Sequence, residues 1–440
     1  MLTLEAQAPG RRPPRMARRW ARRLAYGLLM AAAGTGPALA QEAALGSNLQ
    51  SLLAFARTQS PELAAMRQEA DAAAQRVDPA GALPDPVLRV ELMNINNYGT
   101  DASPSLLPWK VGETKYTLMQ SLPLWGKREL KRDAASADAR QANARTEAAW
   151  AELAARIKAA YADYYRAAGN ERLSNEVLGL MARLEQVSQA RYAGGLGGQA
   201  DAIRAQLEQT AMRAELIALD GEKHQIRARL NALLARESNA PLADPLDLRP
   251  LPPLNTADAS TLAERARTRN PLIQAELARV AAAQNNRELT QRNRYPDLTV
   301  GVSPSQMGSR ITTWGVMVEM NIPLQQDTRR SQEREADAML AAARSRVESL
   351  SQQLLGELAV NLAALESARR TESLVKTQLL PQSELALKSA LAAYENGKAE
   401  FSMLLEAQRQ IRKARQEILK AQVDAQMRLA EIERIVGEDL

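Results

Sequence analysis

The sequence predicts an α+β protein that is mostly α-helical and repeats one structural plan twice. The stretch Lys127–Ala193 contains no proline, and Gln325–Ala393 contains one proline and one glycine. Both are rich in Ala, Leu, Glu, Gln and Arg, which lose little side-chain freedom in a helix. Each follows a short alternating segment that ends in Pro-Leu, at Pro123 and Pro323, 200 residues apart. Strand, turn and very long helix, written twice, indicate a tandem repeat.

The predicted helices are far longer than those of a globular domain. At about 1.5 Å per residue, each would span on the order of 100 Å. An average helix in a globular protein has about 11–12 residues. The chain therefore has to form an extended rather than a compact molecule.

The positive charge of the chain is concentrated at its start. The sequence has a formal net charge of +6, from 57 basic and 51 acidic residues. Residues 1–40 contain seven arginines and one acidic residue, so the rest carries equal numbers of each sign. A neutral body offers no electrostatic footprint for nucleic acid, and we expect no nucleic-acid partner.

Residues 1–40 have the pattern of a secretory signal peptide. An arginine-rich start precedes the apolar run Leu24–Ala33 and the small-residue cleavage site Ala38-Leu39-Ala40. A transmembrane anchor is the alternative, but the run is shorter than the roughly 20 residues that a membrane span needs. We predict cleavage after Ala40, with either Met1 or Met16 as the start.

Residues 41–240 are predicted to form the first repeat. Apolar residues occur at helical spacing from Asn48 to Arg76, with a break at Ser60-Pro61, where proline suits the first turn of a new helix. Two strands with period-two alternation are expected within about residues 86–122. The long helix should then reach a tight turn and return as a second helix to about Leu234. The glycines of this turn are Gly194, Gly195, Gly197 and Gly198.

Residues 241–258 form a linker with five prolines, and residues 259–440 are predicted to form the second repeat. Its two strands are expected within about residues 295–323, and its helical hairpin turns at Gly397. The closing helix has a seven-residue repeat, which predicts coiled-coil packing. The repeat positions are Leu404, Ile411, Ile418, Ala425 and Ile432.

The two long helices also share a weak point. Gly179 and Pro381 occupy matching places in the two repeats. Both residue types disfavour a helix interior. We therefore predict a discontinuity at the same height in both helices.

Four amphipathic strands in one chain predict an assembly of several chains. A membrane barrel needs about eight strands or more, and lipid requires closure because an open edge leaves backbone groups unpaired. Three chains would supply twelve strands. We predict a trimeric 12-strand β-barrel continued by a long α-helical barrel, with outward aromatic residues suited to an interfacial belt. The strand charges predicted to face a watery lumen are Arg89, Glu91, Lys115 and Glu319.

Several motifs resemble the TolC-like outer membrane efflux family over nearly the whole mature chain. They are the tandem repeat, "SPEL" at Ser60–Leu63, "NPLI" at Asn270–Ile273, and the Tyr-x-x-Gly turn followed by "SMLLEAQ" at Ser402–Gln408. The segment from "LPDP" at Leu83 to "LMQSLPLWGKRELKRDA", which ends at Ala134, is most similar to the CzcC/CusC-type heavy-metal branch.

This resemblance implies a homotrimer in the outer membrane of a Gram-negative bacterium, with a helical extension across the periplasm. It implies a periplasmic adaptor (membrane fusion) protein and an inner-membrane pump of the RND type as partners, passive export of heavy-metal cations, and no cofactor. A general drug, solvent or secretion duct of the same family is an alternative, and a periplasmic coiled-coil scaffold or adaptor is another. Enzyme activity is not expected, since no cysteine, phosphate loop or nucleophile elbow is present.

The family's periplasmic entrance lies at the two hairpin tips, where acidic residues constrict the pore. The resemblance places Asp201 and Arg204 at these positions after the first turn, and Met403 and Glu406 after the second. We hypothesise that Asp201, Arg204, Glu400 and Glu406 form an inter-helix charge network that keeps the tip closed. The alternative is that they are ordinary solvated charges of a coiled coil.

Methionines in and near the strands are candidate metal ligands, because thioethers bind soft cations. Their faces differ, and methionine is also a flexible filler of gaps. Packing is the favoured interpretation, and no metal site is assigned. The methionines are Met93, Met119, Met307, Met317 and Met320.

Overall fold

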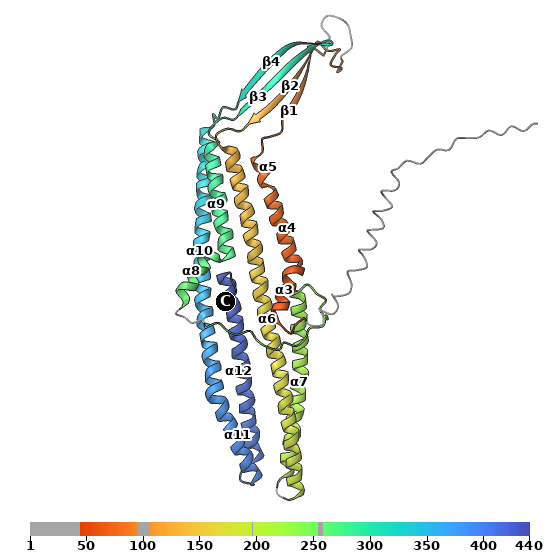
Figure 1. Cartoon of the computed structure of the whole chain (residues 1–440), viewed down its shortest axis with the longest axis vertical. Helices are drawn as coiled ribbons and strands as arrows, with labels where there is room; N and C mark the ends of the chain where they lie inside the picture. Colours follow the sequence, from red (N-terminus) through yellow and green to blue (C-terminus); the bar gives the residue numbers. More distant parts are fainter. Residues whose placement is uncertain (1–44, 96–104, 196, 254–257) are drawn as a thin grey trace, which may run out of the picture.

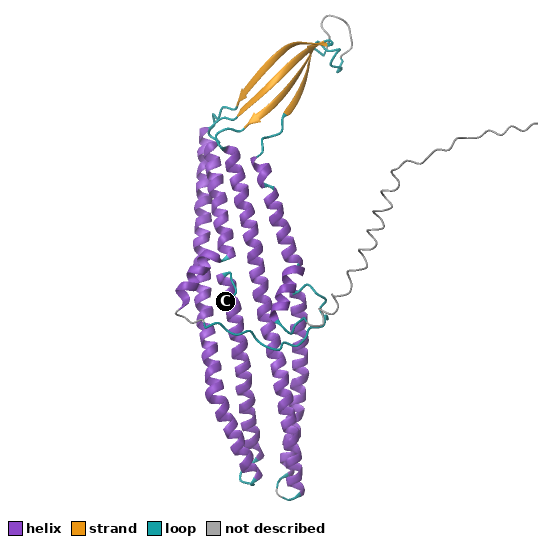
Figure 2. Cartoon of the chain, viewed as in Figure 1, coloured by secondary structure: helices purple, strands orange, loops and turns teal. Residues whose placement is uncertain are grey.

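The computed structural model describes residues 45–95, 105–195, 197–253 and 258–440. The predicted signal peptide lies outside the described residues. The molecule is long and narrow, with one small sheet at one end and helices along the rest of its length (Figures 1 and 2). None of the described helices combines the length and apolar composition that a membrane-crossing helix requires.

The order of elements follows the predicted repeat. The first half contains α3 (Leu49–Gln59), α4 (Pro61–Gln75), α5 (Val77–Gly81), β1 (Val87–Met93), β2 (Glu113–Leu122), α6 (Lys127–Ala193) and α7 (Gln199–Leu233). The second half contains α8 (Ala259–Arg269), α9 (Pro271–Arg292), β3 (Leu298–Met307), β4 (Arg310–Met320), α10 (Gln326–Leu374), the π-helical turn η2 (Val375–Leu379), α11 (Leu380–Glu395) and α12 (Phe401–Val436).

The two long helices differ in continuity, so one half of the predicted discontinuity is wrong. The helix α6 is a single helix that runs through Gly179. The second long helix is interrupted by η2, just before Pro381. Glycine keeps its backbone N–H, so the helical hydrogen bond survives. Proline has no N–H, and its ring collides with the carbonyl four residues earlier, so the helix inserts a wider turn there.

The sheet combines strands of both repeats. Its order is β1-β2-β3-β4, and every neighbouring pair is antiparallel. The central pair, β2 with β3, joins the first repeat to the second. Within the described part of one chain, β1 and β4 are therefore the free edges.

The lower helices form two hairpins, which we call hairpin 1 (α6 and α7) and hairpin 2 (α11 and α12). The predicted seam of α12 is confirmed, since Leu404, Ile411, Ala425 and Ile432 are buried and Ile418 is half-buried. An apolar cluster near the tips holds the two hairpins together, with Met181 and Leu184 of hairpin 1 against residues of hairpin 2 such as Phe401, Leu404 and Ala407.

At mid-height, an ion cluster joins both repeats, the linker and the C-terminal end; we call Lys158, Arg249, Glu433 and Asp439 the mid-height cluster. Glu433 of α12 accepts hydrogen bonds from Arg249 at 2.7 and 2.8 Å, from Lys158 at 2.8 Å and from the Leu440 amide at 3.0 Å. Its side chain is only 3% exposed. Lys158 comes from α6 and also pairs with Asp439. Buried charges require such complete pairing.

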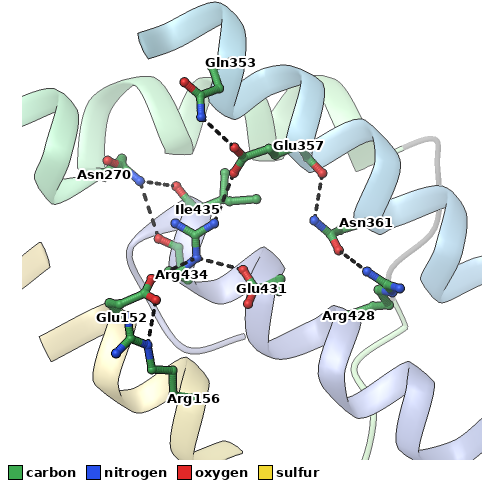
Figure 3. Close-up of polar contacts among 10 residues, drawn as sticks. All are labelled: Glu152, Arg156, Asn270, Gln353, Glu357, Asn361, Arg428, Glu431, Arg434 and Ile435. Atoms are coloured by element: carbon green, nitrogen blue, oxygen red, sulfur yellow. Dashed lines mark hydrogen bonds and ion pairs between the residues drawn. The ribbon is translucent and has the colours of Figure 1, made fainter. Parts of the chain in front are cut away.

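A second set of polar contacts lies beside this cluster and joins three helices (Figure 3). Arg434 of α12 contacts Glu431 on its own helix at 2.7 Å, Glu357 of α10 at 3.1 Å and Glu152 of α6 at 3.6 Å. Burial by itself lowers the pKa of Arg434, but these carboxylates raise it above its ordinary value overall. Asn270 accepts from the first amides of α9 and donates to the Ile435 carbonyl at the end of α12. One side chain thus caps two helices.

Candidate functional site

The register of the sheet places the four predicted lumen residues on one face. Glu91 lies opposite Lys115, and Arg89 lies opposite Thr117. Glu319 lies opposite Thr299, which pairs with Ser121 of the strand that holds Lys115. Antiparallel partners point to the same side of a sheet, and so do residues two apart. This charged side is called the polar face; that it lines a lumen stays a prediction.

The opposite side of the sheet is apolar and uncovered in one chain. Trp314, Val316 and Val318 of β4 are 71%, 82% and 66% exposed. Leu88 of β1 and Leu118 of β2 are 64% and 55% exposed. A contiguous apolar surface of this kind marks contact with lipid or with another protein. We call it the apolar face.

Small residues line part of the polar face where the strands approach closely. A side chain on Gly315 would place its Cβ 2.7 Å from Ser303 Oγ. A side chain on Gly301 would place its Cβ 3.1 Å from the Leu118 carbonyl oxygen. A Cβ at Gly315 would force the Ser303 hydroxyl to move, and a Cβ at Gly301 would push its neighbours by a few tenths of an ångström, so glycine allows the closest approach at both positions.

The joint between sheet and helices is built from both repeats. Trp125, just before α6, stacks on Tyr295 with ring centroids 5.1 Å apart and donates to the Pro296 carbonyl at 3.0 Å. Lys127, 5% exposed, pairs with Asp297 at 2.8 Å. Trp125 and Tyr295 remain 51% and 40% exposed. Amphipathic rings with one apolar side and one polar tip suit a membrane–water boundary.

At the opposite end, the two hairpin tips are joined by a contact that was not among the predicted sites. Arg191 at the end of α6 donates to the carbonyls of Tyr394 at 2.7 Å and Glu395 at 2.9 Å. Its guanidinium also lies over the Tyr394 ring, 4.7 Å from the centroid. The Tyr394 hydroxyl donates to Asp201 at 3.3 Å and lies 3.1 Å from Ser188 Oγ. We call Arg191, Tyr394, Asp201 and Ser188 the tip clasp.

The four predicted gate residues are not brought together within one chain. Among the described residues, Asp201 contacts Tyr394, while Arg204, Glu400 and Glu406 are exposed and form no ion pair with one another or with Asp201. The Glu400 carboxylate accepts from Ser402 at 3.1 Å. A charge network among these four residues is therefore absent inside the single protomer.

The turn glycines lie where they were predicted. Gly195 and Gly397 have φ values of +70° and +69°, which residues with a side chain rarely adopt. Both lie just after the end of a helix at a hairpin tip. Gly194 is the residue that follows α6, and Gly198 is the N-cap of α7. A Cβ on Gly197 would lie 3.3 Å from Arg191 Cβ, so the turn packs closely on the tip clasp.

The sequence pattern indicated one member of the tip clasp, because a tyrosine precedes the turn glycine in both repeats. Tyr192 and Tyr394 are repeat mates, each three residues before a turn glycine, but only Tyr394 is buried. Tyr192 is 52% exposed. The distinction depends on which tyrosine faces the other hairpin, which repeat spacing alone does not decide. The described residues contain no group of three or more His, Cys, Asp or Glu placed to hold a metal ion.

Comparison with known proteins places this architecture in a family. A model of the family described as outer membrane efflux protein matches residues 52–236 and 262–438, which together make up most of the chain. The chain belongs to the outer membrane efflux protein family. It is 25% identical over 412 residues to the cobalt-zinc-cadmium resistance protein CzcC of Cupriavidus metallidurans, covering 91% of this chain and 92% of that protein.

Solved structures of outer-membrane channels share the fold. The outer-membrane channel OprN matches with a TM-score of 0.72 at 20% identity, covering 88% of this chain and 89% of OprN. VceC of Vibrio cholerae matches at 0.74 and 19% identity, covering 89% and 96%. CusC matches at 0.74 and 16% identity, covering 89% and 92%. The predicted family and fold class are confirmed, and this outer membrane efflux protein is related to channels rather than to enzymes.

Proposed function

We propose that three copies of this chain form the outer-membrane exit duct of a tripartite efflux system, which passes heavy-metal cations passively from an inner-membrane pump and a periplasmic adaptor to the exterior. The observation that carries this proposal is the open sheet. It has two free edges, one polar face and one exposed apolar face. Such a sheet is complete only when its edges are paired and its apolar face is covered.

The strand directions support closure by copies of the same chain. Since the neighbouring strands β1 to β4 alternate in direction, the two edge strands run oppositely. Pairing β4 of one chain with β1 of the next continues the antiparallel order without a break. Three chains then give twelve strands, an even number as in bacterial barrels. The polar face turns inward, with Arg89, Glu91, Lys115 and Glu319 lining the lumen, and the apolar face meets lipid.

The helices support the same head-to-tail arrangement. On α7, Ile203, Leu207 and Ile217 are 56%, 69% and 76% exposed, at coiled-coil spacing. The helices α10 and α11 lie on the opposite side of the helical body from α7 (Figure 1). Leu374 at the end of α10 and Leu385 of α11 are 55% and 68% exposed. In a ring of three chains, each α7 stripe meets the α10–α11 side of its neighbour, which buries both surfaces.

The gate is proposed to lie at the tips, between chains rather than within one. Arg204, Glu400 and Glu406 are exposed on hairpin tips that become neighbours in a trimer. The tip clasp fixes the two hairpins of each chain against each other, so that these charges are held in position to pair across the boundary. Release of the clasp by an adaptor would let the tips separate.

Single-channel conductance of the purified protein in planar bilayers tests the gate. Replacing Asp201 and Glu406 together by alanine should raise the conductance, and so should Arg191→Ala, because each removes contacts that hold the tip closed. Arg183→Ala, an exposed arginine of the same helix, serves as the control and should leave conductance unchanged. Equal conductance in all four proteins would argue against the gate.

The choice of heavy-metal cations as cargo rests on the CzcC relative. A deletion strain should be grown with Zn, Cd, Co, Ni, Cu and Ag salts, and in parallel with dyes, detergents and antibiotics. Sensitivity to metals alone, restored by the intact gene, is the expected result. Sensitivity to organic compounds alone would instead identify a general drug or solvent duct.

Extraction distinguishes a barrel from a periplasmic scaffold. A closed trimer should sediment with the outer membrane and require detergent for release, since its apolar face lies in lipid. A protein that washes off in salt or carbonate would refute the duct. Crosslinking of cysteines introduced at Ile203 and Leu385 in the detergent-purified protein should give a covalent trimer if the proposed helix contact is right.

A further inference from the structure

Three neighbouring strands place two methionines on either side of a glycine. In the register, Met119 of β2 lies opposite Gly301 of β3, and Gly301 lies opposite Met317 of β4. The three residues therefore form a row across the sheet. Because cross-strand partners share a face, both thioether side chains project to the same side.

Because Gly301 has no side chain, the side chains of Met119 and Met317 can both occupy the space above it. The position that a Cβ would occupy lies 3.2 Å from Met119 Cγ and 3.2 Å from Met317 Cε. The two side chains thus converge over the glycine. Met119 is 6% exposed, and Met317 is partly exposed. The Met119 side chain is therefore buried, whereas the Met317 side chain is partly accessible to solvent.

This row lies on the polar face. Lys115 and Ser121 flank Met119 at even spacing on β2, and Glu319 follows Met317 by two residues on β4. Glu319 has no ion-pair partner among the described residues of its chain and is exposed. A carboxylate with free acceptor oxygens next to paired thioethers favours a cation there.

The other strand methionines do not join this pair. Met320 lies on the apolar face, opposite Leu298. Met93 and Met307 lie at the far ends of their strands, away from Gly301. The strand methionines lie on different faces of the sheet, as the alternation predicted. The strand register shows that Met119 and Met317 lie on the same face and next to each other.

We propose that Met119 and Met317 form a contact site for soft monovalent cations, such as Ag⁺ or Cu⁺, on the lumen wall of the duct. The site rests on the proposed function, since only the closed trimer turns the polar face toward a lumen. Thioether sulfur prefers soft cations over Zn²⁺ and over hard ions. Three chains would place three such pairs at one level of the lumen, where they would hold the cargo briefly on its way out.

Silver binding to the detergent-purified full chain tests the site. The protein is incubated with silver nitrate in a buffer without chloride or thiols, freed of unbound metal, and analysed for metal content by mass spectrometry. Wild type should retain about one silver ion per chain, and Met119→Leu/Met317→Leu should retain none. Leucine fills nearly the same volume as methionine, so packing over Gly301 is kept and only the sulfur is lost. Met320→Leu, on the opposite face of the same strand, is the matched control and should bind silver like wild type.

The outcomes separate this site from the proposed function. Equal silver retention in the double variant and in wild type would overturn the site, whether or not the protein conducts. Loss of silver in the Met320→Leu control would also overturn it, because binding would then not depend on the shared face. If the purified protein forms no channel, the duct itself fails independently of the silver measurement. Addition of excess Zn²⁺ should leave silver bound; its displacement by Zn²⁺ would contradict a thioether site.

Discussion

Removing the carboxylate at the centre of the mid-height cluster should destabilise the helical body strongly. Glu433 is 3% exposed and accepts four hydrogen bonds, two from Arg249, one from Lys158 and one from the Leu440 amide. In Glu433→Ala, the Lys158 ammonium, 6% exposed, keeps only Asp439 as a partner. The Arg249 guanidinium loses both of its bonds to Glu433. Breaking a buried pair by removing one partner costs about 3–5 kcal/mol.

The assay is urea unfolding of the detergent-purified protein, followed by far-ultraviolet circular dichroism. Glu384→Ala provides a matched control, because its contact with Arg415 at 3.8 Å is 51% exposed on the Glu384 side. Exposed pairs contribute at most about 1 kcal/mol. Glu433→Ala should therefore lower the unfolding midpoint far more than Glu384→Ala.

A triple variant that removes all three charged side chains tests whether the loss of stability in Glu433→Ala comes from unpaired charge or from lost packing. Replacing Lys158, Arg249 and Glu433 together by methionine, methionine and leucine leaves no buried unpaired charge, so most of the lost stability should return. Equal midpoints for Glu433→Ala and Glu384→Ala would refute the reasoning. A triple variant no more stable than Glu433→Ala would show that these residues act through something other than paired charge.

Three further predictions follow from particular contacts. Burial raises the pKa of Asp244, but hydrogen bonds from Tyr164 and Lys223 bring it below its ordinary value overall. The Asp244 carboxylate therefore stabilises the folded protein at pH values above its unfolded pKa of 3.8, and this stabilisation is lost as the pH falls through its folded pKa. The urea unfolding midpoints of wild type and Asp244→Asn should accordingly converge in acid. Gly315→Val should reduce the yield of folded protein in the outer-membrane fraction, since its Cβ would meet Ser303 Oγ at 2.7 Å and displace that hydroxyl; a normal yield would show that the strands accommodate the added side chain. Asn270→Ala should cost about 1–2 kcal/mol in the same unfolding assay, because it removes the cap of α9 and a bond to α12; Asn270→Asp, which keeps the acceptor, should lose less.

Much of the fold could be predicted because it is written in local patterns. The helix Lys127–Ala193 was predicted with the bounds that the structure gives it, since helix-forming residues fill it and a glycine turn ends it. Period-two alternation placed the four strands and identified which side of each carries Arg89, Glu91, Lys115 and Glu319. The turn glycines were recognised because only glycine tolerates the left-handed backbone at Gly195 and Gly397.

The candidate sites depend on pairings that local patterns do not contain. The predicted gate charges do not meet within one chain, whereas Arg191 meets Tyr394 across 203 residues of sequence. The convergence of Met119 and Met317 over Gly301 follows from strand register, which alternation does not give. The π-helical interruption of the second long helix lies just before Pro381 and has no counterpart at Gly179, because the lost hydrogen bond matters more than helix propensity.

The sequence by itself determined the repeat, the lengths of the helices, the faces of the strands and the family. The helix lengths and the strand faces depend on residues within a few positions of one another, so composition and period are enough to specify them. The repeat follows from matching segments about 200 residues apart, and the family from the resemblance of its motifs. Only the tertiary structure decided which helix faces meet, that Lys158 pairs with Glu433 275 residues away, and which methionines share a point on the sheet. Such contacts join segments far apart in the chain, and their geometry is set by how whole helices and strands pack together.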